Sequence, residues 1–77
     1  MNQRKFRWIN EDIVLDFKLP KVLQNTIVEA EEADLANDAA EYDYIVDAID
    51  VLCKEYYVIG TFTQHQWDLV IQKYPMS

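Results

Sequence analysis

Apolar residues recur with helical spacing through the middle of the chain. Between residues 42 and 56 they are separated by steps of three and four, so they fall within roughly 120° of one helical face. Asn37 or Asp38 can cap the start of this run, and Gly60 can take the left-handed conformation after its end. The pattern predicts a central helix over residues 39–58. Its core-facing residues are Tyr42, Ile45, Val46, Ile49, Leu52, Cys53 and Tyr56.

A C-terminal helix is indicated mainly by its ends. Thr63 and Gln66 have the spacing of a capping box, and Phe62 and Trp67 occupy the two positions of a hydrophobic staple. Pro75 cannot continue a helix. We therefore predict a helix over residues 64–74. Its apolar face consists of Trp67, Val70, Ile71 and Tyr74.

A further helix is expected to begin at Pro20, a residue favoured in the first helical turn, and to extend over residues 20–36. The break at residues 37–38 is short, so this helix and the central one should be antiparallel neighbours. Its apolar residues divide between one face with Leu23, Ile27 and Ala30 and another with Val28 and Leu35.

Residues 1–19 are rich in apolar residues but less regular. Their alternation between 13 and 19 is typical of extended chain. Phe6–Ile9 and Ile13–Phe17 could form a small hairpin, an extended arm could cross the helices, or Asn10 could cap a short helix. The fold class predicted is all-α: one small three-helix domain over residues 1–77 with an extended or hairpin-like N-terminal arm.

The central helix has a second, weaker apolar strip on nearly the opposite side from its core stripe. The strip consists of Tyr44, Ala48 and Val51, which we take as candidate partner-binding residues. Tyr44 needs a cover, either the N-terminal arm or a partner, and we favour the arm. If a partner covers it instead, one helix face serves the core while the other is available for binding.

The negative charge is concentrated in the same region. The chain has 14 Asp and Glu against 7 Lys and Arg, a net charge of −7, and residues 22–53 hold nine acids and no base. Such a surface repels free nucleic acid, so we expect no direct nucleic-acid binding. It could instead bind a basic partner protein by mimicking nucleic acid. The candidate acidic face comprises Glu31, Asp34, Asp43, Asp47 and Asp50.

Catalytic and metal-binding patterns are sparse. The only histidine, His65, should face water in the first turn of the last helix, and Cys53 lies within the core stripe. No EF-hand loop, Glu-x-x-His motif or glycine-rich phosphate loop is present. We therefore predict no enzymatic activity, no cofactor and no metal site.

Compartment and membrane association follow from composition. No run of 18 apolar residues could span a membrane, and the basic N-terminus is not followed by the apolar segment of a signal peptide. A single Cys53 cannot form an internal disulfide, which fits a reducing cytosol. A cytoplasmic location is expected.

The order of these parts resembles the small uncharacterised acidic accessory proteins of bacterial conjugative transposons and related mobile elements. The resemblance covers about residues 19–75 and rests mainly on Tyr57, Gly60, Gln66, Trp67, Asp68, Lys73, Tyr74 and Pro75. It implies a bacterial cytoplasmic setting and an accessory or regulatory role, and it brings no activity or catalytic residue.

Taken together, these features predict a non-enzymatic, acidic protein-interaction module. The partner would be another protein, or a second copy of the chain in a homodimer. The alternative is an inhibitor of the nucleic-acid-mimicking or immunity type, which would bind a basic protein through the acidic helical face.

Overall fold

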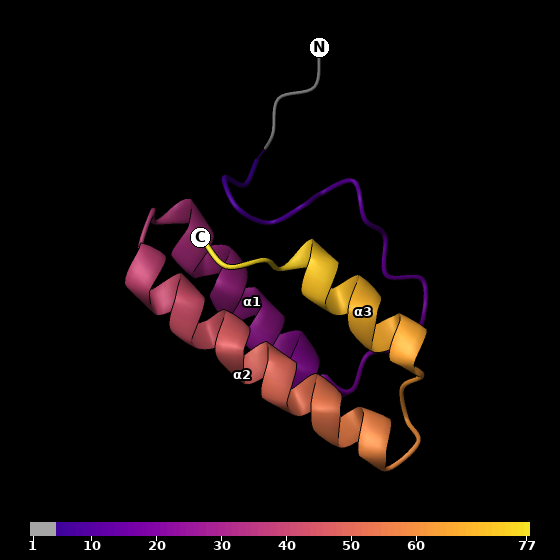
Figure 1. Cartoon of the computed structure of the whole chain (residues 1–77). Coiled ribbons are helices and arrows are strands. Elements are labelled where there is room, and N and C mark those ends of the chain that lie inside the picture. The colour runs from indigo at the N-terminus through magenta and orange to yellow at the C-terminus, as the bar shows by residue number, and fades with distance from the viewer. Residues whose placement is uncertain (1–4) are drawn as a thin grey trace.

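The computed structural model describes residues 5–77 and contains three helices. They are α1 (Lys21–Leu35), α2 (Ala39–Val58) and α3 (Gln64–Lys73), and the described residues form no strand (Figure 1). The predicted all-α class is confirmed, and every helix boundary lies within one residue of its prediction. Pro20 is the N-cap of α1, with ψ at 149°, rather than its first helical residue.

The helix ends form as the sequence indicates. The Asp38 carboxylate caps α2 by accepting the backbone N–H of Glu41 at 3.1 Å. Thr63 and Gln66 make the reciprocal bonds of a capping box at the start of α3, at 3.1 and 2.8 Å. Gly60 follows the end of α2 with φ at +85°, a conformation that costs a residue with a Cβ atom about 1–2 kcal/mol.

Helix α2 is the centre of the packing. The helices α1 and α2 form an antiparallel pair and α3 packs on α2, whereas α1 and α3 make no close backbone approach to each other (Figure 1). The core lies between these helices, and burial of each large aliphatic side chain in it stabilises the fold by about 1.5–3 kcal/mol. Fully buried core residues are Leu23, Ala30, Tyr42, Ile49, Cys53 and Val70.

The structure describes residues 5–20 of the N-terminal arm, and the first four residues of the predicted arm lie outside the described residues. Residues 5–20 contain no helix and no strand, so neither the hairpin nor the short helix forms there, and the chain has bends and a turn at residues 11–12. Phe6 and Ile9 are buried in the core, with 9% and 1% of their surfaces exposed. Asn10 turns the chain by accepting the amide of Asp12 on its side chain. Beyond the turn, the alternate residues Leu15 and Phe17 pack against the core.

Asp34 fixes the start of this arm to α1. Its fully buried carboxylate accepts the backbone N–H groups of Arg7, Trp8 and Ile9 at 2.8, 2.9 and 3.1 Å. The Arg7 guanidinium returns to the Asp34 carbonyl at 3.0 Å. The placement of Asp34 on an exposed acidic face was therefore wrong, because a carboxylate with three amide donors can be buried without losing its hydrogen bonds.

Lys73 holds the middle of the arm against the end of α3. Its amino group donates to the carbonyls of Asn10 and Ile13 at 3.2 and 2.6 Å, while the Asn10 amide donates to the Lys73 carbonyl at 2.8 Å. The arm thus reaches both α1 and α3, the two helices that do not pack on each other. The arm therefore packs as a fourth segment beside the three helices.

Candidate functional site

The side of α2 that faces away from the core carries a row of exposed apolar side chains. Tyr44, Val51 and Val58 are 75%, 54% and 72% exposed, and each is seven residues from the next. Because seven residues make nearly two turns, the three lie along one line of the helix. Ala48 lies between them and is half-buried. We call Tyr44, Ala48, Val51 and Val58 the outer face of α2.

The structure brings together the three residues predicted to bind a partner, but the arm does not cover them. Tyr44 is 75% exposed, so the expectation that the arm would cover it was wrong for residues 5–20. The reason is that Asp34 and Lys73 hold the arm over α1 and α3, away from this side of α2. Val58 was not among the predicted residues, although its distance of seven residues from Val51 indicates the same line of the helix.

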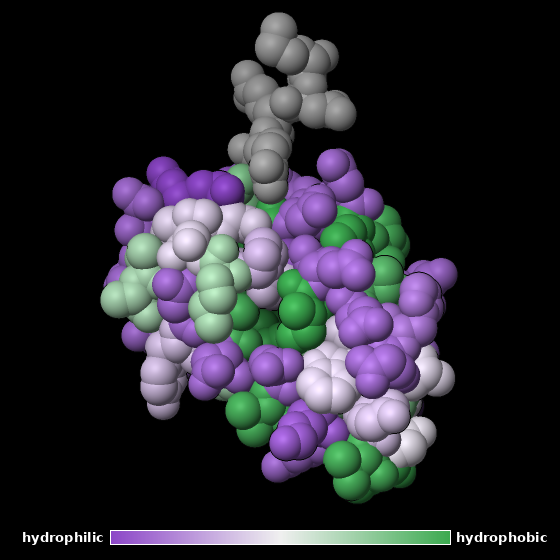
Figure 2. All heavy atoms as spheres, viewed as in Figure 1, coloured by the Kyte–Doolittle hydropathy of each residue, from purple (hydrophilic) through white to green (hydrophobic). Residues whose placement is uncertain are grey.

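The outer face ends in a shallow apolar hollow at the C-terminal end of α2. The hollow has a volume of about 480 Å³. Ile59, just beyond the last helical residue, adds a side chain that is 72% exposed. Hydrophobic surface over this end of α2 is visible in Figure 2. The lining residues are Val51, Lys54, Glu55, Tyr56, Val58 and Ile59.

Three residues of the predicted acidic face, Asp43, Asp47 and Asp50, form a row on α2, and two of them make contacts within the fold. Asp43 accepts the backbone N–H and the hydroxyl of Ser77 at 2.7 and 2.8 Å, which ties the C-terminus to α2. Asp50 accepts the indole N–H of Trp67 at 2.9 Å and so joins α2 to α3. Asp47 is exposed and has no such partner among the described residues, so it is the member of the row that is available to another molecule.

The remaining acids do not complete a single acidic face. Asp34 is buried and Glu31 is half-buried near Tyr74, on the side of the arm. A separate group surrounds a hollow of about 300 Å³ between α1 and the start of α2. That group contains Glu29, Glu32, Asp38 and Glu41. Because the charges are divided among these places, they do not gather on one side of the molecule, and the charge density of any one side is lower than it would be if all of them lay together.

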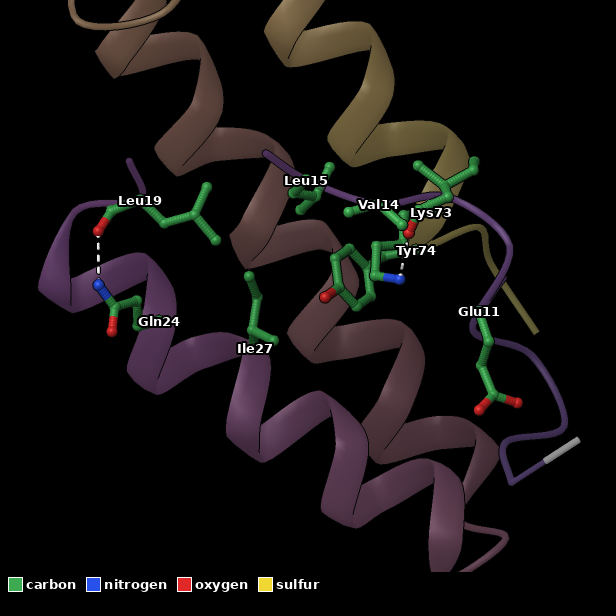
Figure 3. A pocket seen from close by; sticks show the side chains of 9 residues that line it. Glu11, Val14, Leu15, Leu19, Gln24, Ile27, Lys73 and Tyr74 are labelled. Carbon is green, nitrogen blue, oxygen red and sulfur yellow. Dashed lines mark hydrogen bonds between the residues drawn. The ribbon is translucent and has the colours of Figure 1, made fainter. Parts of the chain in front are cut away.

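A third hollow lies beneath the arm (Figure 3). Its volume is about 350 Å³, and Ile27, Tyr74 and Leu15 turn toward it from α1, the C-terminal segment and the arm. The two charged groups at its edge are already bound within the chain. Lys73 donates to two carbonyls, and the Glu11 carboxylate accepts the amides of residues 5 and 6. This hollow therefore offers a ligand apolar contact but no unoccupied charge.

The side chains that could serve as a nucleophile, a general base or a metal ligand do not form a site in the described part of the chain. Cys53 is free and fully buried as predicted, and burial, with a smaller contribution from Asp50, raises the pKa of its thiol to about 12. A thiol with such a pKa is a poor nucleophile at neutral pH. His65 is exposed, as predicted. Within residues 5–77, no three His, Cys, Asp or Glu side chains converge as metal ligands would.

No known protein family, curated protein or solved structure matches the chain with significant similarity. No helix in the described part of the chain is both long and apolar enough to cross a membrane. The fold and the surface of the chain therefore carry the functional inference.

Proposed function

We propose that the protein is a non-catalytic interaction module that binds a partner protein, either a different chain or a second copy of itself, through the outer face of α2. One observation carries this proposal: Tyr44, Val51 and Val58 are exposed in line on a helix whose opposite side already supplies a complete core. Scattered apolar residues are normal on a surface, but an aligned row marks a place where another surface packs. Tyrosine is also among the residues that contribute most to protein–protein binding.

The margins of the outer face suit a protein partner better than a small ligand. Asp47 and Lys54 are exposed beside the apolar row and form a charged margin, and the exposed Glu55 lies within the row between Val51 and Val58. An apolar centre with a charged rim is the usual composition of a protein interface. The hollow at the C-terminal end of α2 is shallow, whereas small-molecule sites usually enclose most of the ligand. The free, buried Cys53 supports a reducing cytosol as the setting.

Site-specific photo-crosslinking tests this proposal in the cells that make the protein. A photo-reactive residue at position 51 should crosslink to a partner protein, and the same residue at the exposed position 72 of α3 should not. The captured protein is then purified and titrated. Val51→Asp should weaken its binding at least about tenfold, because a charge would replace apolar contact at the centre of the interface.

Val14→Asp is the matched control, since Val14 is 74% exposed on the arm and receives the same substitution. It should leave binding unchanged. The proposal is wrong if position 51 captures nothing beyond what position 72 captures, or if the purified partner binds Val51→Asp as tightly as the native chain.

A further inference from the structure

The outer face of α2 has the spacing of a coiled-coil seam. Tyr44, Ala48, Val51, Glu55 and Val58 follow one another at alternating steps of four and three, which is the repeat that keeps side chains facing a second helix. Four of the five residues are apolar. The seam covers 15 residues, and its ends are 14 helical steps apart, or about 21 Å at 1.5 Å per step. The seam therefore has the spacing and length to pack against a second helix.

From the charges beside this seam we infer that its occupant is the same helix of a second copy, lying antiparallel. This inference rests on the proposed function, because it names the partner of the same surface. Lys54 is the only Lys or Arg between Lys21 and Lys73, and it lies on the same margin of the seam as Asp47, seven residues away. Both are exposed and neither has an ion-pair partner within residues 5–77.

When two copies pair antiparallel, one register brings Asp47 of each copy opposite Lys54 of the other. Layers form in which Ala48 of each copy meets Val51 of the other, at the centre of the seam. In the next layers, Tyr44 meets Glu55 of the second copy, where the phenol hydroxyl can donate to the carboxylate. On the margin, Asp47 then lies opposite Lys54 of the second copy. The two-fold axis makes every one of these contacts occur twice.

Other arrangements place like charges together. A parallel pair would bring Glu55 against Glu55 of the second copy within the seam. An antiparallel pair shifted by seven residues would bring Lys54 against Lys54 of the second copy. Like charges at such positions disfavour a pairing, so charge complementarity selects the register with Asp47 opposite Lys54.

The contact should be weak. Two helices that meet along about 21 Å bury less than the roughly 1,200 Å² of a stable interface, and each copy carries a net charge of −7. A dissociation constant on the order of 100 µM is therefore expected. Sedimentation velocity from about 5 to about 500 µM should show the mass rise from one chain toward two.

Charge reversal distinguishes this register from general association. Asp47→Lys should weaken the dimer about tenfold, because it creates two Lys–Lys contacts, even though it lowers the net negative charge of the chain. Lys54→Asp should weaken it similarly. The double variant, in which the two charges are exchanged, should restore the native affinity. Circular dichroism of each variant confirms that the helices remain folded.

Asp16→Lys and Lys18→Asp on the exposed part of the arm are the matched controls, with the same changes of net charge. They should change affinity no more than net charge alone requires. A monomer at every concentration, or a dimer that the exchange variant does not restore, overturns the inference. Crosslinking from position 51 to a different protein, with the isolated chain monomeric, would overturn it while leaving the proposed function in place.

Discussion

The backbone amide of Trp8 donates a 2.9 Å hydrogen bond to the Asp34 carboxylate, across 26 positions of the sequence. The same carboxylate accepts the amides of the two flanking residues, Arg7 and Ile9. One buried side chain thus supplies the hydrogen bonds that a neighbouring strand would otherwise give. This contact allows an arm without regular secondary structure to hold a fixed position and to place Ile9 in the core.

Replacing Asp34 should destabilise the protein more than replacing any exposed acid. In Asp34→Ala the amides of residues 7–9 lose their common acceptor while Ile9 stays buried, so we expect the free energy of unfolding to fall by about 3 kcal/mol. Urea denaturation measures the change. Asp47→Ala, at an exposed position of α2, should shift stability by less than about 0.5 kcal/mol. Equal losses in the two variants would contradict the anchoring role of Asp34.

The sequence was sufficient for the helices but not for this anchor. Periodicity and caps are local, so Asp38, Gly60 and Thr63 could be assigned without knowledge of the fold. The role of Asp34 depends on backbone amides more than 20 residues away. In the sequence Asp34 follows other acids on the same helix, so it looks like one more exposed residue. No periodicity reports such a contact, because the acceptor and its donors belong to different segments.

The residues of the outer face could be predicted from helix geometry, but their exposure could not, again because it depends on contacts between distant segments. Spacing placed Tyr44, Ala48 and Val51 together, since that depends only on helix geometry. Whether the arm covered them depended on where the arm was anchored, and Asp34 and Lys73 determine that. Alternation of apolar residues in the arm indicated extended chain but gave no direction across the helices.

Lys73 should control the middle of the arm. In Lys73→Met the carbonyls of Asn10 and Ile13 lose their charged donor, while the aliphatic part of the side chain is preserved. We expect a loss of about 1–2 kcal/mol in stability and faster proteolysis within residues 10–19. Limited proteolysis with mass spectrometry locates the cleavage. Lys18→Met, on the exposed side of the arm, should leave the cleavage rate unchanged; faster cleavage there as well would show that the loss of any lysine is sufficient.

Stability should fall in alkaline solution because buried groups must remain neutral. Burial, with a smaller effect of Asp50, raises the pKa of Cys53 from 9.0 to about 12. Burial also raises the pKa values of Tyr42 and Tyr74 above 10.0, and the Tyr42 hydroxyl has no hydrogen-bond partner among the described residues. The folded state therefore retains protons that the unfolded state releases, so stability is unaffected below pH 9 and decreases above it.

The thiol contribution can be measured from the slope of that decrease. Cys53 alone should lower the free energy of unfolding by about 1 kcal/mol at pH 10 relative to pH 8, and the tyrosines add to the decrease above pH 10. In Cys53→Ala the slope between pH 8 and pH 10 should become flatter, whatever the cavity costs at both pH values. An identical slope in the two proteins would show that the thiol does not titrate differently on folding.

Gly60 provides a test of backbone conformation separate from packing. A Cβ atom added there would have no neighbour within 4 Å, so Gly60→Ala creates no clash. Its φ of +85° is nevertheless unfavourable for an L-residue, and we expect a loss of about 1 kcal/mol in thermal or urea unfolding. Asn37, with φ at +57°, is the matched position, and Asn37→Gly should be neutral or slightly stabilising. A neutral Gly60→Ala would contradict the cost assigned to this backbone conformation.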